Sequence, residues 1–180
     1  IKGIDIRTVG SGSTGATNVK RVLGKKFFFI VMILDMLKGL IPILAVKYIS
    51  FMPINIINID IICILTGIIL VVGHSKSIYL KFSGGKSVAT SVGVLLGLCW
   101  QAALLAFLIW IAVVYVSKYV SLGSIVALFC TPILMWLFGQ PLSYIVFTLA
   151  CALYVSLYLH KENIQRLIAG TENKISFKGE

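Results

Sequence analysis

Long runs of apolar residues constrain the fold of this chain more than any other feature of its sequence. These runs lie at residues 27–49, 59–72, 88–116, 122–138 and 142–159. A helix of about 20 residues crosses a hydrocarbon core of about 30 Å, and a soluble domain has no interior that would hold runs of this number and length. Because 59% of the chain is hydrophobic and its mean hydropathy is +1.02, we predict an all-α, polytopic membrane bundle with about six spans.

The run at 88–116 is too long for one crossing, and Trp100-Gln101 interrupts it. We therefore expect two short helices, roughly 87–98 and 101–117, joined outside the cell. Four crossings between Ser87 and His160 put the polar segments at both ends on one membrane face, whereas three would put them on opposite faces. Residues 50–58 are expected to form a short external loop.

The basic residues are concentrated in the segments that this topology puts on one side. The chain has 16 Lys and Arg against 6 Asp and Glu, a net charge of +10. Six basic residues lie in 1–26, three in 74–87, one at Lys118 and four in 160–180. Cytoplasmic loops carry such an excess, so we expect 1–26, 73–87 and 160–180 to be cytoplasmic. This charge suits anionic membrane lipid or an anionic substrate, and its scatter between spans argues against nucleic acid.

Two charged residues fall inside the first apolar run. Asp35 and Lys38 lie three residues apart, on one face of a helix. Because charges at that depth are costly, we expect them to pair with each other or with a neighbouring helix. The four cysteines have no paired spacing, and neither His74 nor His160 has a second ligand at metal spacing, so we predict no disulfide and no metal site.

The first polar segment, residues 10–21, combines three glycines with serine, threonine and asparagine side chains. Glycines let backbone amides turn toward one point, which is what an oxyanion needs. With a helix that begins near Ala16, Asn18 and Arg21 share a face, and Arg21 offers a bidentate clamp for a phosphate. A Gly/Ser hinge that leads into a helix explains the composition equally well.

The second polar segment, residues 73–87, ends in Gly84-Gly85-Lys86-Ser87. A nucleotide P-loop requires glycine six residues before the lysine, and that position is Leu80, so we reject a nucleotide site. A glycine turn with a lysine at a helix start still suits a single phosphate.

The third polar segment, residues 160–174, has His160, Asn163 and Arg166 on one broad helical face, where all three can meet one anion. Glu172 is expected to orient Arg21 or Arg166 by an ion pair. A solvated helix with its basic residues on lipid headgroups is the simpler interpretation of this segment. Ser121 and Ser124 reach the same membrane rim, where they either join the polar cluster or cap the next helix.

Together the polar segments resemble one family of membrane enzymes. The motifs are Gly10-Ser11-Gly12-x-x-Gly15-Ala16-Thr17-Asn18-Val19-x-Arg21; Gly73-His74 with Phe82-x-Gly84-Gly85-Lys86-x-Val88-Ala89-Thr90; and His160-x-Glu162-Asn163-Ile164-x-Arg166-Leu167-x-x-Gly170-x-Glu172. They are similar to those of the bacterial acyl-phosphate:glycerol-3-phosphate acyltransferases, the PlsY type. The resemblance implies a single membrane acyltransferase domain over 1–180, in the bacterial inner membrane, with a first of seven helices preceding Ile1.

The resemblance also implies the reaction and the residues that serve it. The reaction is acyl transfer from acyl phosphate to the sn-1 hydroxyl of glycerol 3-phosphate, the first step of phospholipid synthesis, and it needs no cofactor. The implied catalytic residues are Ser11, Arg21, His160 and Asn163. The implied substrate-binding residues are Thr17, Asn18, Gly84, Gly85, Lys86, Ser124 and Arg166, with Glu172 as structural support. The hydroxyl proton goes to His160 or to a substrate phosphate oxygen, and both routes are open.

This sequence departs from the family pattern at three places. The family commonly has Asn and an aliphatic residue at Ser13-Thr14, an aromatic-proline pair at Lys76-Ser77, and Lys-Gly-Gly-Lys-Gly at 83–87. These departures favour, as one alternative, a membrane subunit that has lost activity. The other alternative is a transporter of phosphorylated metabolites or anions, whose broken helices would also direct amides at a charged ligand. The motifs carry no information on acyl-chain preference or oligomeric state.

Overall fold

The computed structural model describes residues 3–49 and 58–175, and every regular element in these ranges is a helix. The prediction of an all-α chain is thus confirmed. The external loop expected at 50–58 lies outside the described residues except for Asn58, which caps the helix that follows it. The chain divides into two compact units, Ile1–Gly97 and Leu98–Glu180.

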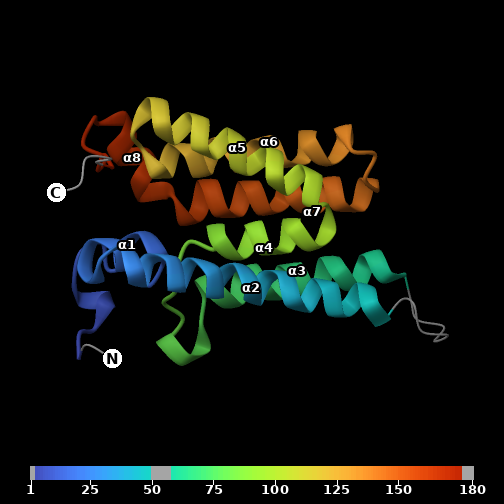
Figure 1. Cartoon of the computed structure of the whole chain (residues 1–180), viewed down its shortest axis with the longest axis horizontal. Helices are drawn as coiled ribbons and strands as arrows, with labels where there is room; N and C mark the ends of the chain where they lie inside the picture. Colours follow the sequence, from blue (N-terminus) through green and yellow to red (C-terminus); the bar gives the residue numbers. More distant parts are fainter. Residues whose placement is uncertain (1–2, 50–57, 176–180) are drawn as a thin grey trace. The chain divides into compact units, whose positions relative to one another are not determined.

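The first unit carries the first and second polar segments on two long helices and their connections (Figure 1). Its helices are η1 (Ile6–Thr8), α1 (Ala16–Leu23), α2 (Lys25–Ile49), α3 (Ile59–Ser75), η2 (Ile78–Leu80) and α4 (Val88–Leu98), whose last residue belongs to the second unit. The helix expected near Ala16 therefore begins at that residue. Helices α2 and α3 lie side by side, and α1 packs on the first turns of α2.

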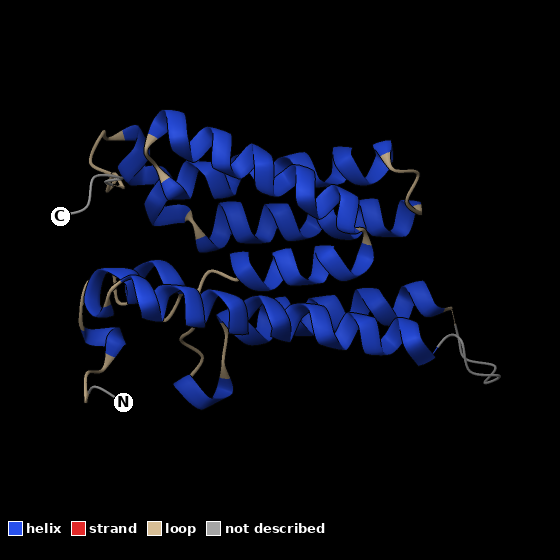
Figure 2. Ribbon diagram, viewed as in Figure 1, coloured by secondary structure: helices blue, strands red, loops and turns tan. Residues whose placement is uncertain are grey.

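The second unit is a helical hairpin with a third helix beside it (Figure 2). It contains α5 (Trp100–Ser117), α6 (Val120–Leu137), α7 (Leu142–Leu153), η3 (Tyr154–Leu159) and α8 (Lys161–Ile168). Gly123 allows α6 to approach α5 closely, because a Cβ there would lie 2.5 Å from Val114 Cγ2. The third polar segment begins where η3 ends.

Five of the described helices are long and apolar enough to cross a membrane. The break predicted in the run 88–116 is confirmed, since α4 ends at Leu98 and α5 begins at Trp100. Helix α5, Trp100–Ser117, agrees with the predicted helix 101–117 to within one residue. Helix α4 has 11 residues, about 16 Å, and covers about half of a hydrocarbon core.

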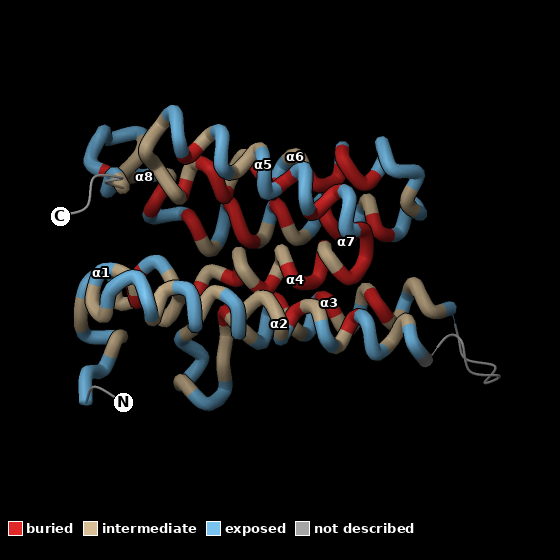
Figure 3. The backbone as a smooth tube through the Cα atoms, in the orientation of Figure 1, coloured by how far each residue is buried: buried red, intermediate tan, exposed pale blue. Residues whose placement is uncertain are grey.

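Large apolar side chains are exposed on the long helices. Figure 3 marks the exposed residues along these helices in pale blue. Ile69 on α3 is 70% exposed, Val116 on α5 81% and Trp136 on α6 67%. Side chains of this kind on every long helix need an apolar solvent. The chain is therefore a multi-pass membrane protein.

Glycines set the distance between α2 and α4. A Cβ on Gly39 would collide with the carbonyl oxygen of Thr90, and a Cβ on Gly93 would collide with that of Met36. Close approach of helices through small residues is typical of membrane bundles, where lipid gives no hydrophobic force between helices. This packing holds the helix that follows the second polar segment against α2.

Candidate active site

Asn18 organises the loop of the first polar segment. Its side chain is 1% exposed. Its Oδ1 accepts a hydrogen bond from Ser11 N at 2.8 Å, and its Nδ2 donates to the carbonyl oxygens of Ile6, Val9 and Ser13 at 2.9–3.1 Å. Gly10, at a φ of +63°, passes directly over this carboxamide, where a Cβ would collide with Oδ1. Asn18 therefore holds the loop from inside, and its hydrogen-bonding groups serve the protein backbone.

The expectation that the glycine-rich loop turns its amides toward one anion is wrong for three of them. Ser11 N donates to Asn18, Gly12 N donates to Val9 O at 3.1 Å, and Gly15 N donates to Ser13 Oγ at 3.2 Å. A buried or half-buried amide takes the partner that its own loop supplies. The groups that this segment offers to a ligand are instead the exposed side chains of Ser11, Thr17 and Arg21.

The loop that contains Gly84 and Gly85 lies against the end of α3. Gly85 N donates to His74 O at 3.3 Å. A Cβ on Gly84 would collide with that carbonyl oxygen, and a Cβ on Gly85 would collide with His74 Nε2. Glycine is therefore required at both positions for close approach, and Lys86 follows directly in a loop whose position the end of α3 determines.

Ser87 ends this loop in a left-handed conformation, with φ +58°. Its side chain is 1% exposed, and Oγ donates to Val71 O at 2.7 Å. Left-handed backbone costs a non-glycine residue roughly 1–2 kcal/mol, and one net hydrogen bond returns about 1 kcal/mol. The serine at this position thus ties the loop to α3 while it carries the strain that glycine would avoid.

His74 joins the two charges of α2. Lys38 Nζ lies 2.6 Å from Asp35 Oδ1 and 2.5 Å from His74 Nδ1, and Asp35 Oδ1 lies 3.7 Å from the same nitrogen. The predicted pairing of Asp35 with Lys38 is confirmed, and the neighbouring helix α3 adds His74. A lysine ammonium can only donate, so Nδ1 accepts and the neutral ring carries its proton on Nε2.

Glu172 is the centre of a hydrogen-bonded cluster in the third polar segment. Its Oε1 accepts from Ser121 Oγ at 3.0 Å and from Asn163 Nδ2 at 2.7 Å, and its Oε2 accepts from Arg166 Nε at 2.7 Å. The predicted ion pair with Arg166 is confirmed. Burial opposes ionisation of Glu172, but these three hydrogen bonds and the charge of Arg166 outweigh it and hold its pKa below the ordinary value.

The end of α8 explains how Glu172 reaches these partners. Gly170 has a φ of +69°, its amide donates to Leu167 O, and Thr171 N donates to Arg166 O at 2.8 Å. This is the left-handed helix ending in which glycine reverses the chain. The reversal carries Glu172 back to Asn163 and Arg166.

His160 follows a wide helical turn. Residues Tyr154–Leu159 form a π-helix, and His160 Nδ1 lies 2.8 Å from Val155 O. Because a carbonyl only accepts, Nδ1 carries a proton, which leaves Nε2 as the ring nitrogen that can accept. The ring is buried, at 3% exposure, and π-turns of this kind occur often at functional sites.

Of the two serines that precede the third segment in sequence, Ser121 joins the Glu172 cluster. Ser124 Oγ donates to Val120 O at 3.0 Å and accepts from Trp110 Nε1 at 3.3 Å. Ser124 therefore neither joins the Glu172 cluster nor caps α6; it bonds to a carbonyl of its own helix and to Trp110 of α5. Within residues 3–49 and 58–175, no three His, Cys, Asp or Glu side chains gather as metal ligands.

Comparison with known proteins decides the family. A family model described as glycerol-3-phosphate acyltransferase matches residues 1–170. The glycerol-3-phosphate acyltransferase of Nostoc sp. is 49% identical over 99% of this chain and 83% of that protein. That of Desulforamulus reducens is 45% identical over 98% of this chain and 84% of that protein. The chain belongs to the glycerol-3-phosphate acyltransferase family.

Solved structures of this family have the same fold. The crystal structure of PlsY (YgiH), an integral membrane glycerol 3-phosphate acyltransferase, in its glycerol 3-phosphate form matches with a TM-score of 0.86 and 37% identity. The lysophosphatidic acid form matches with a TM-score of 0.84 and 36% identity. Both alignments cover 97% of this chain and 84% of the other.

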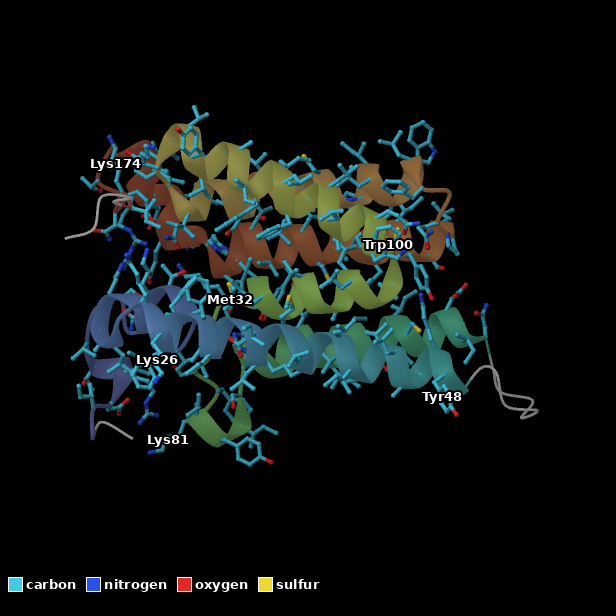
Figure 4. All side chains as sticks on the ribbon, viewed as in Figure 1. Lys26, Met32, Tyr48, Lys81, Trp100 and Lys174 are labelled. Atoms are coloured by element: carbon cyan, nitrogen blue, oxygen red, sulfur yellow. The ribbon has the colours of Figure 1, made fainter. Side chains whose placement is uncertain are left out.

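Two residues of this acyltransferase have structural roles that the sequence analysis did not predict. Ser87 entered only as a departure from the family's glycine, yet its hydroxyl fastens the loop to α3. His74 entered as a motif residue and as a rejected metal ligand, yet it contacts both the glycines of the loop and Lys38 of α2. The sequence signal that could have indicated these roles is a polar residue close to the glycine pair Gly84-Gly85. The departure from the family pattern at Lys76-Ser77 lies directly after α3, at the start of the connection that carries Lys81 (Figure 4).

Proposed function

We propose that this chain transfers a fatty acyl group from an acyl phosphate to the sn-1 hydroxyl of glycerol 3-phosphate, which gives lysophosphatidic acid and inorganic phosphate. The observation that carries the proposal is family membership over nearly the whole chain. The two matching structures are named for glycerol 3-phosphate and for lysophosphatidic acid. These two molecules differ by one acyl group, as the substrate and product of an acyl transfer do.

The chemistry needs no covalent enzyme intermediate. The sn-1 hydroxyl oxygen attacks the acyl carbon, the bond from that carbon to the phosphate oxygen breaks, and phosphate leaves with the electron pair. An acyl phosphate is already activated, so positioning and electrostatic stabilisation supply most of the rate. The hydroxyl proton goes to His160 Nε2 or to a substrate phosphate oxygen.

The side chains divide between the two phosphate-bearing substrates. Ser11, Thr17 and Arg21 hold the acyl-phosphate head group and the oxyanion, with Asn18 fixing their loop. Gly84, Gly85 and Lys86 hold glycerol 3-phosphate. In the third segment His160 and Asn163 orient the hydroxyl, while Arg166 and Ser124 contact substrate and Glu172 keeps Asn163 and Arg166 in position. The buried acceptor nitrogen of His160 and the three hydrogen bonds to Glu172 support this assignment.

We propose that the reaction takes place at the cytoplasmic face of the bacterial inner membrane. The segments that hold these residues also hold most of the basic residues of the chain. Cytoplasmic segments carry such an excess of lysine and arginine.

The donor is tested with the purified chain in lipid vesicles. Glycerol 3-phosphate is offered with acyl phosphate or with acyl-CoA, and lysophosphatidic acid is measured. We expect lysophosphatidic acid and an equal amount of inorganic phosphate when the donor is acyl phosphate, and neither when it is acyl-CoA. Product from acyl-CoA only, or none from either donor, would contradict the proposal.

The phosphate clamps are tested by Arg21→Ala and Lys86→Ala. A lost hydrogen bond to a charged group costs about 1.5–3 kcal/mol, so each variant should lower kcat/KM by roughly ten- to a hundredfold. Lys25→Ala removes an exposed cation at the start of α2 and serves as the control. Rates near that of the parent protein in both variants would refute the assignment.

A further inference from the structure

Three ionisable side chains lie under the glycine loop of the second polar segment. Asp35 and Lys38 come from α2, and His74 comes from the last turn of α3. The His74 ring is in contact on both sides, since Nδ1 accepts from Lys38 Nζ while Nε2 lies so near Gly85 that a Cβ there would collide with it. The side chains of Asp35 and His74 are 13% and 9% exposed.

Through these contacts, α2 determines where the glycine loop lies. Asp35 fixes Lys38 at 2.6 Å, Lys38 fixes the tilt of the imidazole ring, and the ring fixes the height of Gly85 above α3. Gly85 is buried and precedes Lys86 directly. A change in the ring would therefore move the amide and ammonium groups that follow it.

We propose that Asp35, Lys38 and His74 are positioning residues that hold the Gly84-Gly85-Lys86 loop for the phosphate of glycerol 3-phosphate. The inference rests on the proposed function of that loop. The three side chains act through the loop, so their loss weakens binding of glycerol 3-phosphate and leaves the acyl donor site as it is. A group that fixes a binding loop changes KM for that substrate, whereas general damage to the fold lowers the active fraction for both substrates.

The first test measures KM for each substrate in His74→Asn and Lys38→Met. Asn keeps an acceptor near the position of Nδ1 but removes the ring that supports Gly85, and Met removes the donor at similar length. We expect KM for glycerol 3-phosphate to rise about tenfold in each, with KM for acyl phosphate and kcat changed less than about threefold. Lys26→Met, on an exposed residue of α2, is the matched control for loss of a lysine.

The second test is a steric rescue that does not depend on how well a single variant folds. Gly85→Ala adds a methyl group that would collide with His74 Nε2, so the loop must shift and KM for glycerol 3-phosphate should rise. The double variant with His74→Asn makes room for that methyl, and its KM should fall below that of Gly85→Ala alone. Gly73→Ala is the control, because a Cβ there meets nothing within 4 Å.

Lys86→Ala is measured beside these variants to separate the two proposals. If Lys86→Ala raises KM for glycerol 3-phosphate while the cluster variants do not, the inference is wrong and the proposed function of the loop stands. If none of these variants changes that KM, both are overturned. A Gly85→Ala defect that His74→Asn does not relieve would also overturn the inference.

Discussion

Asn18 shows how one buried carboxamide determines a loop. Two donor hydrogens and one acceptor oxygen engage four backbone groups that would otherwise be unpaired. Asn18→Ala removes all four bonds, and at about 1 kcal/mol each we expect a loss of roughly 2–4 kcal/mol of stability. Thermal unfolding in detergent micelles measures this, with exposed Asn173→Ala as the control. An unchanged Tm in Asn18→Ala would contradict the structural role.

Ser87 combines a strained backbone with a useful hydroxyl. Ser87→Gly relieves the left-handed φ and loses the bond to Val71 O, so the two effects nearly cancel. Ser87→Ala loses the bond and keeps the strain, so we expect it to be about 1 kcal/mol less stable than Ser87→Gly. Unfolding of the two variants side by side measures the difference. Equal stability of the two variants would show that the left-handed backbone at this position carries no strain.

Glu172 gives the third segment a pH dependence of known sign. Its pKa is lowered in the folded protein, so its stabilisation is complete above the ordinary range of glutamate and is lost as the pH falls through the lowered pKa. Glu172→Gln should therefore lower Tm at about pH 7, and its difference from the parent should narrow toward about pH 4. Tm measured across that range checks this. A difference that widens on acidification would contradict the ionised state.

At the scale of helices, glycine contacts decide how closely α2 and α4 pack. Gly93→Ala puts a methyl group on Met36 O, and overpacking of this kind costs about 1–3 kcal/mol. Gly73→Ala, inside α3 with no atom within 4 Å of the new methyl, should instead gain up to about 1 kcal/mol from helix propensity. Thermal unfolding of both variants compares them. A tolerated Gly93→Ala would contradict the close packing.

The helices were predictable from the sequence because long apolar runs indicate segments surrounded by lipid, and interruptions of these runs indicate where helices end. Trp100-Gln101 marked the break between α4 and α5, and Ala16 marked the start of α1. The uses of polar groups were harder to predict, because each amide or hydroxyl has several partners within reach. Ser11 N bonds to Asn18 rather than facing an anion. The π-turn before His160 has no signal in the apolar pattern, since it adds one residue without changing composition.

At the scale of the whole molecule, the account requires three polar segments to face one side of the membrane. The first and second segments belong to one compact unit and the third to the other. Between them lie α4, α5, α6 and α7 with η3, and α4 is only 11 residues long. Whether α4 counts as a crossing therefore decides which face the third segment reaches.

Labelling with a membrane-impermeant thiol reagent tests this requirement most directly. Single cysteines replace Lys25, Lys81 and Lys161, one exposed residue in each segment proposed to be cytoplasmic, and Ser143 in the first turn of α7, in a background without the native cysteines. In sealed inverted vesicles we expect the three lysine positions to react and position 143 to be protected, with the reverse in right-side-out vesicles. If position 143 reacted together with positions 25 and 81 in inverted vesicles while position 161 was protected, the third segment would lie on the opposite face, which would contradict the account.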